Sequence, residues 1–230
     1  MPRRPGAPLS RIIYTARVVD TQDPDGLGRV QVSLDGFETA LELPWIRQVG
    51  LYASKDFGAV FLPEKDDEVI VLQGDSDGLD QMICLGSVYN GARKPKTTDG
   101  DGKNNLKELR TRSGHALTFS DEDGKEQITL RTPDDKLLLT MQHADGVLKL
   151  KASDELRLDV SGGKIQVDCK DATVSASNQI TVEGDSKISV QSKSANISVQ
   201  AGQDISVKAS TTVKVEAPTI SLAGSRVELG

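Results

Sequence analysis

The sequence predicts an all-β protein: a small N-terminal barrel followed by an intertwined triple-stranded β-helix, formed by a homotrimer. Apolar residues occur in pairs, one residue apart, about every eight positions through the last third of the 230-residue chain. All eight aromatic residues lie between Tyr14 and Phe119. The long remainder therefore offers only Val, Ile, Leu and Ala for an interior. A thin fibre admits such side chains and excludes rings.

Composition argues against several classes of function. The formal net charge of −6 disfavours a nucleic-acid-binding surface, which needs clustered Lys and Arg. No apolar run is long enough for a membrane-spanning helix. Residues 1–9 are rich in Arg, Pro and Gly without an apolar segment, so we expect a flexible arm and not a secretory signal. Cys84 and Cys169 are expected to be reduced, buried thiols of a chain made in the cytoplasm.

Residues 10–90 predict a compact barrel. Runs with the two-residue period of strands alternate with turn residues such as Asp35-Gly36. The runs are Ile12–Asp20, Gly28–Leu34, Leu43–Val49, Ala59–Pro63, Glu68–Gly74 and Gln81–Tyr89. Five or six strands in about 80 residues, without a helical pattern, fit an oligonucleotide/oligosaccharide-binding (OB) barrel. Seven of the eight aromatic residues lie here, and most are expected to fill its core.

The rest of the chain divides into three segments. Residues 91–110 are polar and rich in Gly, Lys and Asn, which predicts a linker or neck. Residues 165–230 carry the regular eight-residue repeat and predict the narrow triple-stranded β-helix. Residues 111–164 carry apolar pairs at wider intervals and predict wide β-windings; these pairs are Leu117/Phe119, Ile128/Leu130, Leu137/Leu139, Leu148/Leu150 and Leu156/Leu158.

In the narrow segment, both members of a pair point to the same side of a strand because successive side chains alternate. Two inward side chains per short strand cannot build a core within one chain, so we expect other copies to complete it. Polar residues between the pairs form turns and tolerate water. The expected trimer core is Ile165, Val167, Ile180, Val182, Ile188, Val190, Ile197, Val199, Ile205, Val207, Val213, Val215, Ile220 and Leu222.

Several short sequence motifs of the barrel and neck segments occur in the order seen in VgrG proteins. They are Ala16-Arg17-Val18-Val19-Asp20, Gly28-Arg29-Val30-Gln31-Val32, Pro44-Trp45-Ile46-Arg47, Gly58-Ala59-Val60-Phe61-Leu62-Pro63, Gln73-Gly74-Asp75-Ser76-Asp77, Gly86-Ser87-Val88-Tyr89-Asn90-Gly91 and Thr111-Arg112-Ser113-Gly114-His115. By this order the chain, over about residues 10–230, resembles phage baseplate assembly protein V and the VgrG spike proteins of contractile injection systems.

The resemblance implies a structural, membrane-puncturing central spike, made in the bacterial cytoplasm and incorporated in the baseplate of a phage tail or tail-like injection particle. VgrG chains usually carry a hub domain ahead of the barrel, whereas about ten residues precede it here, so a separate hub protein is expected above. The 15-residue linker leaves no room for the lysozyme domain of some phage spikes. A PAAR-like tip protein is expected below, docked on Val227, Leu229 and Gly230. The target cell envelope is a transient partner.

No catalytic, cofactor or metal site is expected, and the protein is predicted not to be an enzyme. Ser113 and His115 belong to one predicted strand stretch and do not form a nucleophile–base pair. Two isolated histidines and a C-terminal segment without a His-x-His motif supply no metal-ligand set. Adjacent acids lie in polar stretches and predict solvated turns, not a glycosidase pair; they are Asp66/Asp67, Glu122/Asp123 and Asp134/Asp135.

Other functions remain as alternatives. Nucleic-acid binding by the barrel requires exposed aromatic residues over a basic groove, whereas most aromatic residues are expected in the core. A trimeric tail fibre or adhesin that binds a cell-surface glycan would share the shaft. A β-helical carbohydrate-active enzyme would be a monomer with a longer repeat and a carboxylate-lined groove. The sequence does not distinguish a phage from a tail-like bacteriocin, a secretion apparatus or an extracellular injection system.

Overall fold

A computed structural model describes residues 13–37, 39–73, 78–98 and 100–227. The chain divides into two compact units, Met1–Asp159 and Val160–Gly230. Within the described ranges the regular elements are strands and one 3-10 helix, η1 (Leu79–Gln81). In those ranges no helix has the length and apolar character to cross a membrane. The all-β class is therefore confirmed, while the predicted arm at residues 1–9 lies outside the described residues.

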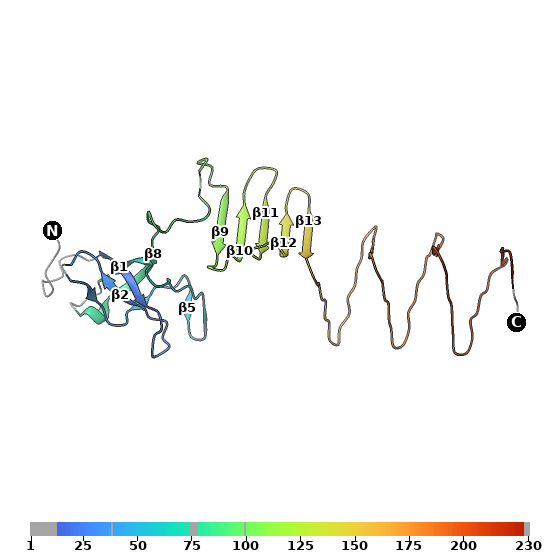
Figure 1. The fold of residues 1–230 in the computed structure, drawn as a ribbon, viewed down its shortest axis with the longest axis horizontal. Helices are drawn as coiled ribbons and strands as arrows, with labels where there is room; N and C mark the ends of the chain where they lie inside the picture. Colours follow the sequence, from blue (N-terminus) through green and yellow to red (C-terminus); the bar gives the residue numbers. More distant parts are fainter. Residues whose placement is uncertain (1–12, 38, 74–77, 99, 228–230) are drawn as a thin grey trace. The chain divides into compact units, whose positions relative to one another are not determined.

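The first part of unit 1 is a small barrel (Figure 1). Strand β1 (Ile13–Asp20) pairs antiparallel with β2 (Gln31–Leu34) on one side and with β7 (Glu68–Leu72) on the other. Strand β7 pairs antiparallel with β8 (Ile83–Ser87), and β8 pairs in parallel with β4 (Arg47–Gln48). This order brings strands from both ends of the predicted barrel segment into one sheet.

A single backbone bridge closes the sheet on itself. The amide of Val30 donates to the carbonyl of Ile46 at 3.0 Å, and the amide of Ile46 donates back at 2.9 Å. Val30 precedes β2 and Ile46 precedes β4, so the bridge joins the two strands into the closed order β1-β2-β4-β8-β7. A short strand, β3 (Leu41–Glu42), pairs along β2 outside this ring. Closure leaves few free edges on the barrel.

The barrel core is aliphatic. Alternate residues of β1, β2 and β7 point inward, as expected for strands with one buried face. Cys84 is buried, as expected, and this burial raises the pKa of its thiol. The core residues are Tyr14, Ala16, Val18, Val30, Val32, Leu34, Leu43, Ile46, Val69, Val71, Met82 and Cys84.

The expectation that most aromatic residues fill the core is wrong. Tyr14 is buried, but Tyr52, Phe57, Phe61 and Tyr89 are exposed. Valine, leucine and isoleucine side chains fill the interior enclosed by these short strands, and the exposed rings lie on the segments that connect them. The argument from buried aromatic residues against nucleic-acid binding therefore no longer holds. The acidic net charge still argues against it, and the absence of nucleic-acid binding stays a prediction.

Two predicted barrel strands also differ from the structure. The run Leu43–Val49 contributes only β4 and the Ile46 bridge, because Pro44 has no amide to donate. The run Ala59–Pro63 forms no strand; instead a hairpin of β5 (Ala53–Ser54) and β6 (Phe57–Gly58) precedes it. Ile12 and residues 74–77, which belong to predicted strands and a turn, lie outside the described residues.

An antiparallel meander follows the barrel in unit 1, each strand hydrogen-bonded to the next along the chain. Its first strand lies inside the segment predicted as a linker, residues 91–110, because Lys107 and Leu109 pair with the strand that carries Phe119 and Leu117. The predicted pair Leu156/Leu158 lies outside any strand. The strands are β9 (Leu106–Arg110), β10 (Ala116–Ser120), β11 (Gln127–Arg131), β12 (Leu137–Gln142) and β13 (Val147–Ala152).

Unit 2 has a different character. Its described residues, 160–227, contain no strand or helix, and the chain runs back and forth between bends (Figure 1). The bends recur about every eight residues, and the apolar pairs lie between them. Every described residue from 153 onward is exposed, so Ile197 and Val199 remain 55% and 70% accessible. Cys169, expected to be buried, is likewise exposed in the single chain.

The barrel core gives a first testable prediction. Leu43→Ala removes a side chain that is 1% exposed, so it should lower the free energy of unfolding by about 2–5 kcal/mol. Leu27→Ala, at a turn position that is 70% exposed, should change it by less than about 0.5 kcal/mol. Fluorescence of Trp45, the single tryptophan, during urea unfolding of the full chain measures both. Equal effects of the two substitutions would contradict the assigned core.

Candidate functional site

One face of the meander is apolar and uncovered in the single chain. Cross-strand pairs set its first row, which runs Leu109, Leu117, Leu130, Leu139 and Leu150 from β9 to β13. Residues directly opposite each other in a sheet share a face. The second row, two residues along each strand, is Phe119, Ile128, Met141 and Leu148. We call these nine residues the leucine face.

The opposite face of the same sheet is polar. Its central row begins with Glu108 and ends with Lys149, and three threonines, Thr118, Thr129 and Thr140, pair between them. The sheet is therefore amphipathic. On the leucine face Leu130 is 52% exposed and Leu148 is 65% exposed, so within the described chain this face has no cover. A large exposed apolar patch marks an interaction surface.

The fourteen residues of the expected trimer core lie in the extended segments between the bends of unit 2. Each is at least half exposed. The structure of one chain therefore does not bring them into a core, and their role stays a prediction. Of the expected tip-docking residues, Val227 is exposed, whereas Leu229 and Gly230 lie outside the described residues.

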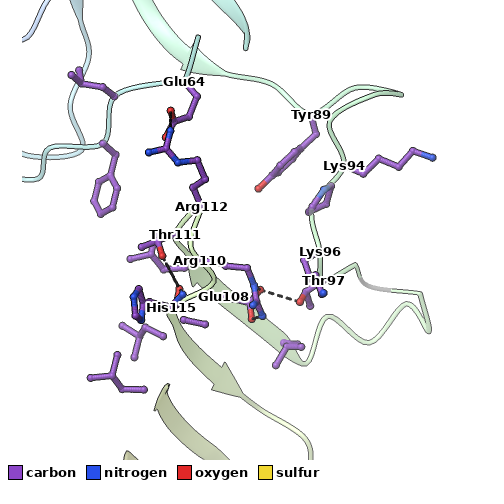
Figure 2. A pocket seen from close by; sticks show the side chains of 18 of the residues that line it. Glu64, Tyr89, Lys94, Lys96, Thr97, Glu108, Arg110, Thr111, Arg112 and His115 are labelled. Carbon is purple, nitrogen blue, oxygen red and sulfur yellow. Dashed lines mark hydrogen bonds and ion pairs between the residues drawn. The ribbon is translucent and has the colours of Figure 1, made fainter. Parts of the chain in front are cut away.

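A groove of about 980 Å³ lies within unit 1, where the barrel meets the meander. Val60, Phe61 and Leu62 of the barrel line it on one side, and Leu109 and Leu117 of the leucine face line it on the other. Its remaining lining includes polar residues of the linker and of the turn between β9 and β10, several of which Figure 2 labels. We call this space the neck groove.

The linker is bound to the barrel at its start. The Asn90 side-chain amide donates to the Glu68 carboxylate at 2.7 Å, and Arg93 Nε donates to Asp67 Oδ1 at 2.8 Å. Arg93 also donates to the carbonyl of Lys65. These contacts join residues more than twenty positions apart, so this part of a segment that looks flexible by composition is held against the barrel.

Further along the linker, Thr97 binds the first strand of the meander, β9. Thr97 Oγ1 donates to Glu108 Oε1 at 3.2 Å, and Arg110 Nε donates to the same oxygen at 2.7 Å (Figure 2). The Glu108 side chain is only 9% exposed, and its hydrogen bond to Arg110 holds its pKa below the usual range. Across the groove, Arg112 of the β9–β10 turn pairs with Glu64 of the barrel at 2.8 Å.

The residues considered for catalysis lie in turns. Ser113 and His115 lie in and beside the β9–β10 turn, not in a strand as assumed, and Ser113 Oγ lies 3.2 Å from Thr111 Oγ1. Gly114 between them has φ near +95°, and a Cβ there would approach Pro133 to 2.9 Å. Of the adjacent acids, Asp67 pairs with Arg93 as described above.

The other two acid pairs have the same character. Glu122 pairs with Lys125, and Asp134 accepts from the amide of Lys136 and the hydroxyl of Thr132. The backbone hydrogen bond from Lys136 is the main cause that lowers the pKa of Asp134. These carboxylates are thus in solvated turns, as their polar surroundings predicted. Groups of three or more potential metal ligands do not occur in the part of the chain that is described.

Sequence reasoning missed the neck groove and the apolar segment beside it. The signal was present: Tyr52, Phe57 and Phe61 lie within a short stretch that also contains Gly50 and Gly58. These rings lie in a glycine-containing connection and not at the buried alternate positions of the strands. Such a cluster indicates a surface that contacts another part of a protein. Residue type alone predicts most of the barrel rings in the core.

Residues 14–89 match the family described as the type VI secretion system/phage-baseplate injector OB domain. The match covers the barrel and confirms the resemblance to baseplate assembly protein V and VgrG over these residues, about a third of the chain. It indicates a structural role in a phage or type VI secretion baseplate, within a tail or injection particle. No curated protein matches the chain.

The linker contacts give a pH prediction. Because the folded-state pKa of Glu108 lies below its ordinary value of 4.5, its ionised form stabilises the fold at neutral pH. That contribution should be lost as pH falls from about 4.5 through the folded-state pKa. Glu108→Gln should therefore destabilise the chain at pH 7 and have a much smaller effect in acid. Denaturant unfolding followed by circular dichroism at both pH values tests this.

Glu155→Gln is the matched control for that experiment. Glu155 is an exposed carboxylate that pairs with Arg157 at 2.8 Å, and exposed ion pairs contribute little to stability. A destabilisation by Glu108→Gln that is the same at every pH, or no larger than that of the control, would contradict the assigned role of Glu108.

Proposed function

We propose that this chain, whose barrel belongs to the injector OB domain family, is the membrane-puncturing central spike of a contractile injection baseplate and works as a homotrimer. The barrels form a collar, the meanders form the wide part of the shaft, and residues 165–230 wind into a narrow triple-stranded β-helix. The narrow segment carries the regular repeat. The wide part, predicted over residues 111–164, would begin earlier, at β9, which lies within the neck predicted over residues 91–110. The proposal combines the barrel family with the exposed apolar repeats.

The observation that carries the proposal is the exposure of the apolar pairs. Residues such as Ile188, Val190 and Ile205 are each more than half accessible in the single chain. Fully burying one such side chain is worth about 1.5–3 kcal/mol, so a regular series of exposed pairs is a strong drive to associate. The bends between them follow the same repeat of about eight residues. Chains wound around one another would bring the pairs together layer by layer.

The leucine face extends the same argument into unit 1. An amphipathic sheet needs another apolar surface to cover its apolar side. Three copies of the meander, packed with their leucine faces inward, would give each face a cover without any other protein. The polar row with Thr118, Thr129 and Thr140 would then lie on the outer side of the sheet, where Thr140 is already buried by its own chain. The number three comes from the family resemblance, not from the geometry of one chain.

Such an assembly suits a mechanical role. Strands in neighbouring windings lie about 4.7 Å apart, so nine repeats rise about 40 Å. Backbone hydrogen bonds between chains, each worth about 1 kcal/mol net, would break together with the apolar contacts when chains separate. Unfolding would therefore be cooperative and slow. A rod of this kind transmits axial force from a contracting sheath into a target cell envelope, and this task requires no active site.

The partners follow from the same proposal. A separate hub protein would bind the collar, and a PAAR-like tip protein would cover the far end of the helix at Val227, Leu229 and Gly230. An uncovered helix end has unpaired backbone groups and an apolar cross-section, and such an edge pairs readily with another chain. This part of the proposal rests on the resemblance to baseplate spikes, and copurification with a hub and a tip protein tests it.

Neighbouring residues of one extended segment test the trimer core. Ile197→Lys places a charge inside the proposed interior, whereas Ser198→Lys places one on the outer side. In the single chain all described residues here are exposed, so a monomer should tolerate both changes equally. We expect Ile197→Lys to abolish trimeric mass or resistance to SDS without heating, and Ser198→Lys to preserve both. Light scattering and unheated gels measure this.

The two cysteines supply a second test that needs no substitution. Cys169 lies two residues beyond Val167 and therefore on the same side of the strand. It is exposed in the single chain, but it should be protected from a thiol reagent in the trimer. Cys84 is buried in either state and serves as the internal reference. One fast-reacting thiol per native chain would contradict the trimer, and urea should expose both.

A further inference from the structure

The barrel carries a projecting apolar hairpin, residues 51–58, which we call the barrel hairpin. Leu51 is 90% exposed, and Tyr52 and Phe57 are each more than half exposed. The two rings contact each other with centroids 5.6 Å apart, which gives the hairpin a preformed aromatic edge. Apolar and aromatic residues of this kind are enriched at the centres of protein interfaces.

Local contacts hold this hairpin in shape. The amide of Ala59 donates to the carbonyl of Tyr52 at 2.8 Å, and a Cβ at Gly58 would lie 2.5 Å from that same oxygen, so only glycine fits. Behind the hairpin, Gln48 Nε2 donates to the carbonyl of Phe61 at 2.7 Å. The hairpin is therefore a shaped surface, and it needs little ordering when it binds.

The barrel hairpin does not fill the neck groove of its own chain. The groove is lined by Val60, Phe61 and Leu62, which follow the hairpin, and not by Tyr52 or Phe57. Each chain thus has an apolar projection, the barrel hairpin, and an apolar recess, the neck groove, and the projection does not enter the recess of its own chain. The leucine face runs into the recess through Leu109, Leu117 and Leu130, which line the groove as well.

We infer that in the assembled spike the barrel hairpin of one copy occupies the neck groove of the next copy. The inference rests on the proposed trimer and adds a second, independent contact to it. A copy packed against the leucine face lies at the mouth of the groove, because the two surfaces share Leu109, Leu117 and Leu130. Projection and recess are different surfaces, so the contact is heterologous. Repeated around a threefold axis, a heterologous contact closes into a ring.

The chemistry of the groove favours this occupant over the others considered. Its apolar walls suit aliphatic and aromatic side chains, while Lys94, Lys96 and Arg112 line it as well. A glycan or nucleic acid would leave Val60 and Leu62 facing polar groups. The aromatic edge of the hairpin matches the walls, and the charged groups can stay in water. A segment of a hub protein is the competing occupant, and the experiment below distinguishes the two.

Cysteine crosslinking of the full chain tests the contact. Ser54→Cys in the barrel hairpin and Lys94→Cys at the groove are both exposed positions, so neither should disturb folding. Cys169→Ser removes the other thiol that is exposed in the single chain, and Cys84 is buried. Oxidation, or treatment with a short bis-maleimide, should convert the purified protein into a covalent trimer on a denaturing gel. Three heterologous links join three chains into a closed ring, whereas an isologous link stops at dimers.

Each single-cysteine chain is a control and should give no covalent trimer. A chain with Ser54→Cys and Lys151→Cys, which moves the second thiol to the far strand of the meander, is the matched double control. Trimeric mass by light scattering without the covalent trimer would overturn this inference and leave the proposed function intact. Covalent links that appear only after a hub protein is added would also overturn it. Monomeric mass would overturn both.

A substitution in the hairpin adds a second readout. Phe57→Ser removes half of the aromatic edge and should reduce the yield of covalent trimer several-fold at the same protein concentration. Lys55→Ser, in the turn of the same hairpin, is the control and should leave the yield unchanged. Light scattering confirms that both variants keep the trimeric mass. Equal yields from the two variants would show that the aromatic edge does not make the contact.

Discussion

An extended strand has two sides, and the structure depends on what covers the apolar one. In unit 2, pairs such as Ile205 and Val207 lie on one side of an extended segment, and the chain supplies nothing to bury them. A helix or a compact sheet domain solves this problem with its own later residues. In the described part of this segment, the eight-residue repeats joined by bends do not fold back to cover one another. Within the described residues, this part therefore has no interior of its own.

The same constraint appears in milder form in the meander. Here the backbone hydrogen bonds are satisfied within one chain, because each strand pairs with the next. The apolar face is not covered, and Leu130 and Leu148 remain exposed. Along the chain there is a progression from the barrel, with its own core, through a sheet with one open face, to a segment with neither strands nor a core. The exposure of apolar side chains rises in the same direction.

Polar contacts of the neck join the barrel to the meander. Arg93 binds the barrel, Thr97 binds Glu108, and Arg112 pairs across the groove with Glu64. Such contacts are directional and fix a geometry, whereas the burial of apolar surface is non-directional. The apolar neck groove lies beside these contacts.

Much of the architecture could be predicted from sequence because its signals are local. The two-residue period located β1, β7 and β8, and the spacing of the pairs located the apolar residues of β10 to β13. Local patterns did not show that Pro44 shortens one strand, or that β9 pairs with β10 inside an apparent linker. Those outcomes depend on which distant segment supplies hydrogen-bond partners.

The sequence by itself determined the all-β class, the resemblance of the barrel to a known family and the regular series of apolar pairs, because each depends on residue type and spacing. Only the tertiary structure decided where the rings lie. Residue type predicts most of the rings inside the barrel. Tyr52, Phe57 and Phe61 are instead exposed, and mostly aliphatic side chains brought together by barrel closure occupy the interior. The neck groove likewise exists because Val60 and Leu117, far apart in the chain, line one recess. Burial and recesses depend on which distant residues meet, and residue spacing does not record that.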